Sequence, residues 1–168
     1  MGKLKWLAAY SGQAAAELAA LAGEYRTDSI MVAFEQAIYQ KMDRAGYENL
    51  AEEERIILAV EALEREVNNG GYSQFFINTS KEYASIIVDA LHRIGCEDTA
   101  VLTQEAIHLL GIRGRLTADE IDRAMSEENE ERDRKLNACD SRYCGIGEDI
   151  SEKLMIFIKK NMAKINLP

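Results

Sequence analysis

The chemically richest stretch of the chain lies between Glu66 and Asn78, where a carboxylate, several amide side chains and three aromatic rings follow one another. A carboxylate beside amide donors can bind a polar ligand or transfer a proton if burial or a charged partner shifts its pKa. The sequence shows no such partner, so a ligand-binding or enzymatic pocket stays an alternative. Its lining would be Glu66, Asn69, Tyr72, Gln74 and Asn78.

The same stretch can also be explained by local structure. Two asparagines and two glycines follow an amphipathic segment, and these residue types tolerate the left-handed conformation with which many helices end. The aromatic side chains would then fill the core, and the polar ones would bond unpaired backbone groups. We therefore expect a helix–turn–helix junction with mainly structural residues: Glu66, Asn68, Asn69, Gly70, Gly71, Tyr72, Gln74, Phe75, Phe76 and Asn78.

Metal binding and nucleophilic catalysis have weaker support. His92 and Cys96 are four residues apart, and Cys139 and Cys144 are five apart, so four ligands could meet at a structural zinc. Neither pair has the two-residue gap of a typical zinc motif, and we predict no metal and no cofactor. A nucleophile would need a base beside it. The two histidines, His92 and His108, both fall on polar helix faces.

Two acidic clusters suggest binding through charge. The first is at residues 52–54, and the second, at residues 119–133, holds eight acids against two arginines. Such runs are usually solvated helix faces, but they can also attract a basic protein or imitate the phosphates of nucleic acid. The candidate contact residues are Glu52, Glu53, Glu54, Asp119, Glu120, Asp122, Glu127, Glu128, Glu130 and Glu131.

The helix before the turn is the clearest of the elements that must position these residues. Its apolar residues recur at spacings of four, three and four, which predicts a helix over about residues 50–68 with one buried stripe. Glu66 lies at the edge of that stripe and is expected to be half-buried. The remaining acids are expected on the polar face: Glu53, Glu54, Glu61 and Glu64.

Helical periodicity continues on both sides of this helix. Capping boxes are predicted for Asn49 with Glu52, Thr79 with Glu82, and Thr117 with Glu120. Residues 139–149 are expected to form a loop before a final amphipathic helix. No strand pattern appears, so we predict an all-α fold, a single-domain bundle of about eight to ten helices over residues 1–168. Within it, N-terminal helices (1–47) precede a core (48–168).

Composition limits the cellular setting and the partners. The net charge of -9 argues against direct binding to nucleic acid, which needs clustered Lys and Arg. An odd number of cysteines, three, indicates a reducing compartment. No apolar run approaches the roughly 20 residues of a membrane span, and no secretion signal is recognised. We expect a cytoplasmic protein that does not bind membranes and whose partner is basic.

The pattern Glu66-x-Asn68-Asn69-Gly70-Gly71-Tyr72-x-Gln74-Phe75-Phe76-x-Asn78 resembles the signature of a bacterial family of unknown function that includes DNA mimic protein nineteen. The resemblance extends to residues 50–55, 91–95 and, more loosely, 136–143. It implies an all-α fold and a homodimer. In the mimic protein, an acidic surface occupies the DNA site of a transcription factor and so relieves repression. That mimicry depends on surface carboxylates and not on the signature.

These observations favour an acidic, non-enzymatic interaction protein that binds a DNA-binding or other basic protein, with DNA mimicry as the most specific form of this function. Two alternatives stay open. One is the ligand-binding or enzymatic pocket around residues 66–78. The other is an immunity-like or regulatory protein for a toxin, which would use the same acidic surface with a different partner.

Overall fold

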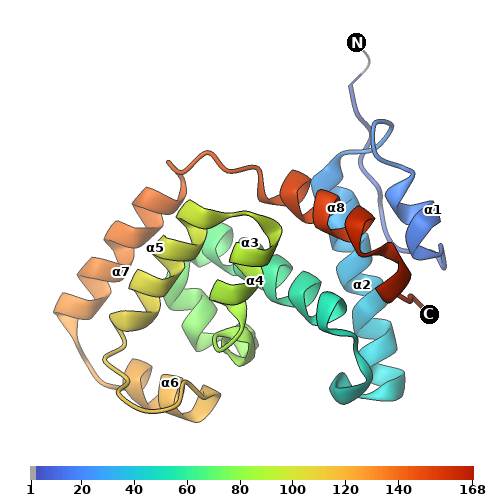
Figure 1. Ribbon diagram of the computed structural model, residues 1–168. Coiled ribbons are helices and arrows are strands. Elements are labelled where there is room, and N and C mark those ends of the chain that lie inside the picture. The colour runs from blue at the N-terminus through green and yellow to red at the C-terminus, as the bar shows by residue number, and fades with distance from the viewer. Residues whose placement is uncertain (1–2) are drawn as a thin grey trace. The chain divides into compact units, whose positions relative to one another are not determined.

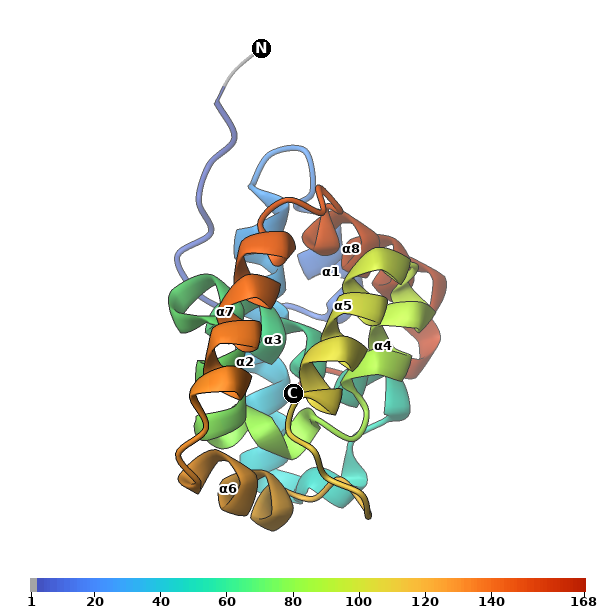
Figure 2. The same cartoon turned by 90° about the vertical axis from the view of Figure 1, so that its left-hand side faces the viewer.

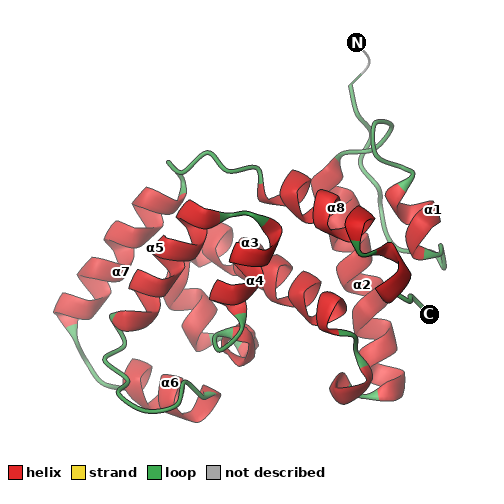
Figure 3. Ribbon diagram, viewed as in Figure 1, coloured by secondary structure: helices red, strands yellow, loops and turns green. Residues whose placement is uncertain are grey.

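The computed structural model describes residues 3–168, which form helices and loops without a β-strand (Figure 3). This confirms the predicted all-α class. Within these residues, none of the helices combines the length and the apolar composition that a membrane span needs. The elements are α1 Ala15–Ala19, α2 Thr27–Ala45, η1 Tyr47–Asn49, α3 Glu52–Ile77, η2 Thr79–Tyr83, α4 Ile87–Ile94, α5 Glu97–His108, α6 Ala118–Ser126, α7 Glu130–Tyr143, α8 Ile150–Lys160 and η3 Met162–Lys164, where η is a 3-10 helix.

The contacts group these elements into two compact units, each described by itself. The first unit contains the residues up to 61 together with 149–168, and the second contains residues 62–148. Helix α3 therefore begins in the first unit and ends in the second. Within the first unit, the C-terminal helix α8 packs on α1 and α2 (Figure 1).

The core of the first unit follows the predicted periodicity. In α2, Ile30, Phe34 and Ile38 are fully buried, at the spacing of one helix face. In α8, Leu154 and Ile158 are also fully buried. Helix α8 was predicted from the sequence as the final amphipathic helix, and its apolar face lies against α2 and α1.

The acids at the start of α3 correct a prediction, because two of them lie inside the first unit and not on its surface. Glu54 is fully buried, and its two carboxylate oxygens each lie 2.8 Å from Lys41 Nζ. One of them also accepts the backbone N–H of Asn166 at 2.9 Å. Glu53 is 3% exposed and pairs with Lys164 at 2.8 Å. Cations from two distant segments make this burial tolerable, so neither acid belongs to a binding surface.

Glu61 is a further correction on the same helix. It was expected on the polar face but is 7% exposed. Ile57, Leu58 and Ala59 are fully buried as well, so this part of α3 is enclosed on more than one side. A helix enclosed in this way buries residues of every face, and periodicity alone then misplaces its polar ones.

The predicted capping boxes are only partly right. Thr117 Oγ1 accepts the Glu120 N–H at 3.3 Å, as predicted. At the start of α3, the interaction is shifted by two residues, since Glu54 accepts the Ala51 N–H at 2.9 Å. The side chain of Asn49 donates instead to a carbonyl at the end of α2. Glu54 therefore caps α3 and holds an ion pair at the same time.

In the second unit, α4 packs on α5, and α5 lies beside α7 (Figure 2). Helix α4 ends, as predicted, at Gly95, which has φ 83°. Two boundaries differ from the prediction. The 3-10 helix η2 takes the place of the helix start at Thr79, and α7 continues to Tyr143 where a loop was expected. The extension is explained by Leu136, Cys139 and Tyr143, which are buried at helical spacing.

Candidate functional site

Helix α3 is interrupted in the middle of the signature by two glycines. Gly70 has φ -153° and ψ 18°, and Gly71 has φ 78° and ψ -176°, whereas the segments on either side are helical. The Gly71 combination is reached without strain essentially only by glycine. A Cβ atom at this position would also lie 2.1 Å from Oδ2 of Asp140. The backbone conformation therefore requires glycine at Gly71, and a Cβ atom there would also displace the carboxylate of Asp140.

The side chain of Asp140 caps the N-terminus of the helical segment that resumes after the break. Its Oδ1 accepts the Tyr72 N–H at 2.7 Å, although the two residues are 68 positions apart. The first N–H groups of any helix lack partners within that helix, and an aspartate oxygen is one of the best acceptors for them. Burial raises the pKa of Asp140, and the bond from Tyr72 opposes that shift. A residue of helix α7 thus satisfies the first N–H of the second segment of α3.

This cap makes a prediction that separates hydrogen bonding from charge. We expect Asp140→Ala to lower the free energy of unfolding by about 1–2 kcal/mol, because the Tyr72 N–H loses its acceptor. Asp140→Asn keeps an acceptor oxygen and removes a partly buried charge, so it should cost less than about 0.5 kcal/mol. Urea unfolding of both variants at neutral pH measures the difference. Equal losses in the two variants would contradict the capping role.

Glu66 connects the two sides of the break. It is 8% exposed, and its Oε2 accepts the side-chain amides of Gln74 and Asn78, each at 2.8 Å. Burial alone would raise the pKa of Glu66, but these two amides and the neighbouring Arg65 outweigh burial and lower it. A carboxylate with a lowered pKa is ionised at neutral pH and is a poor general base. The group is therefore suited to holding the break in shape.

The aromatic side chains of the signature form the core around the break. Tyr72, Phe75 and Phe76 are fully buried. The hydroxyl of Tyr72 lies 2.8 Å from Oγ1 of Thr103, and its ring meets that of Tyr143 edge-on at 5.9 Å. Burial raises the pKa of both tyrosines, so neither phenol ionises near neutral pH. The three rings of the signature therefore fill the core, and the hydroxyl of Tyr72 is hydrogen-bonded within it.

The structure does not gather the five residues of the predicted pocket as free polar groups. Tyr72 is fully buried, and the amides of Gln74 and Asn78 are used by Glu66. Asn69 is exposed, as is the neighbouring Asn68. The geometry of the signature therefore supports the structural interpretation, in which these side chains hold the helix break.

The residues weighed as zinc ligands are not brought together. The exposed His92 bonds through Nδ1 to Oε2 of Glu97 at 2.6 Å. Cys96 and Cys139 are buried, Cys144 is exposed, and none of the three forms a disulfide. Burial raises the pKa of the Cys139 thiol, which makes it a poor nucleophile. From residue 3 to residue 168, no group of three or more His, Cys, Asp or Glu side chains could hold a metal ion.

The second acidic cluster is exposed, but only part of it carries uncompensated charge. Glu120 pairs with Arg123 at 2.7 Å, Glu131 pairs with Lys135 at 2.8 Å, and Asp122 pairs with Lys81. Four exposed carboxylates have no ion-pair partner within 4.0 Å among the described residues: Asp119, Glu127, Glu128 and Glu130. Sequence alone could not distinguish the compensated acids from these, because Lys81 comes from a distant segment.

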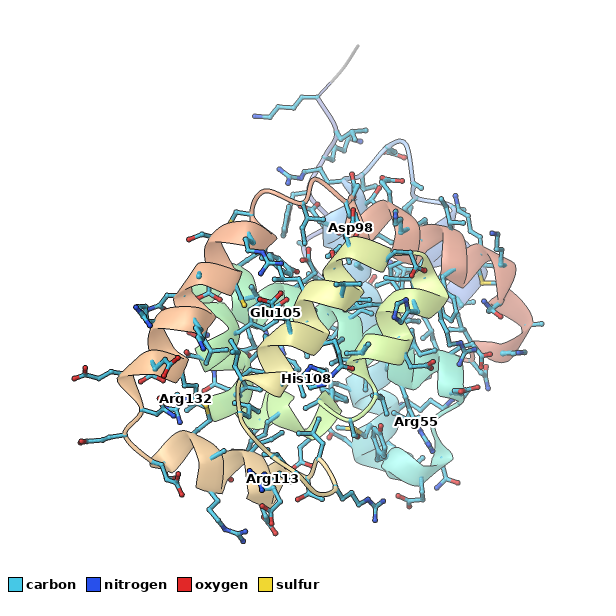
Figure 4. All side chains as sticks on the ribbon, turned by 60° about the vertical axis from the view of Figure 1, so that its left-hand side comes forward. Arg55, Asp98, Glu105, His108, Arg113 and Arg132 are labelled. Carbon is cyan, nitrogen blue, oxygen red and sulfur yellow. The ribbon has the colours of Figure 1, made fainter. Side chains whose placement is uncertain are left out.

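The acids of this cluster that lie around the α6–α7 junction form what we call the acidic corner: Glu127, Glu128, Glu130 and Glu131. All four are exposed. Asn129 caps α7 by accepting the Arg132 N–H at 2.9 Å. The guanidinium of Arg132, which is 7% exposed, donates to the Ala124 carbonyl of α6 and pairs with Asp133 at 2.7 Å. Figure 4 labels Arg132 near the start of α7. The backbone of the corner is thus held at both ends.

Most of the excess negative charge belongs to the second unit. Its residues include 17 acids and 10 bases, which gives a net charge of -7, against 12 acids and 10 bases, or -2, in the first unit. Glu52 is the one acid of the first cluster that is exposed. The acidic surface predicted from sequence therefore reduces to Glu52 and the exposed residues of α6 and α7.

Comparison with known proteins identifies a matching family model. The family model described as DMP19-like protein matches residues 48–161, which is about two-thirds of the chain. No curated protein and no solved structure matches the chain significantly. The matched region contains the whole break in α3, its cap Asp140 and the acidic corner. The chain belongs to the DMP19-like protein family.

Proposed function

We propose that this protein is a non-enzymatic interaction protein that binds a basic protein surface through the acidic corner. The observation that carries the proposal is the set of exposed carboxylates at the α6–α7 junction, three of which have no ion-pair partner within residues 3–168. Unpaired surface charge attracts a partner of opposite sign and speeds its association. The family resemblance supports a DNA-binding protein as the specific partner class, and the corner would then take the place of DNA phosphates.

The fixed backbone of the corner adds to this argument. The cap from Asn129 and the bond from Arg132 to α6 hold the segment between the two helices before a partner arrives. A partner then does not have to order this segment, and the entropic cost of binding falls. The signature around Glu66 contributes by shaping the second unit, and no catalytic role is assigned to it.

The proposal predicts that neutralising the corner weakens binding and its salt dependence. One variant combines the four substitutions Glu127→Gln, Glu128→Gln, Glu130→Gln and Glu131→Gln. We expect it to bind the partner roughly tenfold more weakly, since four exposed ion pairs contribute about 0.3–0.5 kcal/mol each. Proteins captured from a bacterial lysate at low salt would be identified and purified. Their affinities for both forms would then be measured over a range of salt concentrations.

A control variant separates the corner from net charge. The control variant combines Asp43→Asn, Glu48→Gln, Glu82→Gln and Asp89→Asn. It removes the same amount of charge from exposed positions outside the corner, and it should change the affinity for the partner less than threefold. Competition by duplex DNA tests whether the partner's DNA site is the one occupied. A partner whose binding ignores salt and survives neutralisation of the corner would overturn the proposal.

A further inference from the structure

A small open pocket lies in the second unit, between α6 and the segment that precedes it. Its volume is about 210 Å³. Four of its lining residues are spaced as i, i+3, i+4 and i+7 on α6 and its C-cap, so they share one face of that helix. In Figure 4, Arg113 is labelled next to α6. The lining residues are Leu110, Gly111, Ile112, Arg113, Glu120, Arg123, Ala124 and Glu127.

The charges of this lining are balanced, but only one pair is satisfied internally. Arg123 Nη1 lies 2.7 Å from Oε1 of Glu120. Arg113 and Glu127 are exposed, and neither has an ion-pair partner within 4.0 Å in the part of the chain that is described. The pocket therefore presents one free guanidinium and one free carboxylate. A ligand that complements both must itself carry a negative and a positive group.

The local structure indicates where each charged group of such a ligand would bind. Glu127 is the C-cap of α6, where the helix dipole adds negative potential to that of the carboxylate, so an ammonium group is favoured there. Arg113 offers the planar donor pair that matches a carboxylate. Leu110, Ile112 and Ala124 contribute the apolar part of a lining that is mainly polar. These three features define an amphiphilic zwitterion.

We propose that this pocket binds a free α-amino acid with an aliphatic side chain, with its carboxylate on Arg113, its ammonium group on Glu127 and its side chain against Leu110 and Ile112. The volume of about 210 Å³ is enough for a small ligand such as an amino acid. This proposal does not rest on the basic partner proposed above, but the two surfaces share Glu127.

The test uses the full chain labelled with nitrogen-15 and titrated with L-leucine. Amide resonances of Gly111, Ile112 and Ala124 should shift in a saturable way. L-leucinamide lacks the carboxylate and N-acetyl-L-leucine lacks the ammonium group, so each should bind roughly tenfold more weakly, the expected loss of one charge-assisted contact. Arg113→Gln and Glu127→Gln should each weaken the binding of L-leucine by a similar factor.

If the proposal holds, a ligand that lacks one charged group should not lose further affinity when the residue that pairs with that group is changed. Leucinamide should bind Arg113→Gln as well as it binds the unchanged protein, and N-acetyl-leucine should behave likewise with Glu127→Gln. The exposed neighbours provide controls, because Arg115→Gln and Glu128→Gln should leave leucine affinity unchanged. Equal binding of all three compounds, or no shift at about 10 mM leucine, a concentration that still detects weak millimolar binding, would overturn the amino-acid site. Neither result bears on capture of a basic protein.

Discussion

Gly71→Ala is expected to lower the free energy of unfolding by about 3–5 kcal/mol, which is a large share of the stability of a domain of this size. Two costs combine. The backbone at φ 78° and ψ -176° strains any residue with a side chain. In addition, the new methyl group would meet Asp140 at 2.1 Å and displace the cap of Tyr72, so overpacking adds to strain. Urea unfolding followed by circular dichroism measures the loss.

Gly114→Ala is the matched control for this variant. Gly114 lies in a loop of the same unit, and a Cβ atom built there has no neighbour within 4 Å. We expect its effect to stay within about 0.5 kcal/mol, as for most surface substitutions. A loss below about 1 kcal/mol in Gly71→Ala would show that α3 can close its break without the glycine, contrary to the strain argument.

Glu66→Gln is expected to cost about 1.5–3 kcal/mol at neutral pH, the range for hydrogen bonds to a charged group. The amide oxygen of the new side chain can still accept from Gln74 and Asn78, but without the charge that strengthens both bonds. Its NH2 group would also face Arg65, which pairs with the other oxygen of the carboxylate. Circular dichroism should still show a helical protein, because the core aromatics remain. Glu82→Gln, which changes an exposed acid of the same unit, should be close to neutral.

The pH dependence of this variant gives an independent check. The pKa of Glu66 is lower in the folded protein than its ordinary value of 4.5, so the folded state binds this proton less tightly than the unfolded state. The stabilisation is therefore fully present above about pH 4.5 and is lost as the pH falls through the folded pKa. The stability difference between the unchanged protein and Glu66→Gln should shrink between neutral pH and about pH 3. A constant difference would contradict the lowered pKa.

Sequence periodicity predicted the elements well where a helix has one buried face. The stripe of α2 and the final helix α8 are examples, since Ile30, Phe34 and Ile38 of α2 and Leu154 and Ile158 of α8 are fully buried. It failed at the start of α3, where Glu53 and Glu54 are buried and neutralised by Lys164 and Lys41. Such pairs join segments far apart in sequence, and a local pattern holds no information about them.

The candidate site shows the same limit. The asparagines and glycines of the signature correctly predicted a helix interruption. The sequence did not show that Asp140 caps the segment after the break, because that residue lies on a helix 68 positions away and was expected in a loop. Nor did it show which carboxylates of the acidic run are compensated, since Asp122 is paired by Lys81 across the unit.

The cap from Asp140 has a consequence for the order in which the chain becomes structured. During synthesis, the segment from Tyr72 to Ile77 leaves the ribosome long before Asp140 does. A one- to two-turn helix without a cap is not stable alone, so this segment has to wait until α7 is made and docked. At the usual elongation rate of about 5–20 residues per second, that delay is of the order of several seconds. Its three buried aromatic rings remain accessible to chaperones for that time.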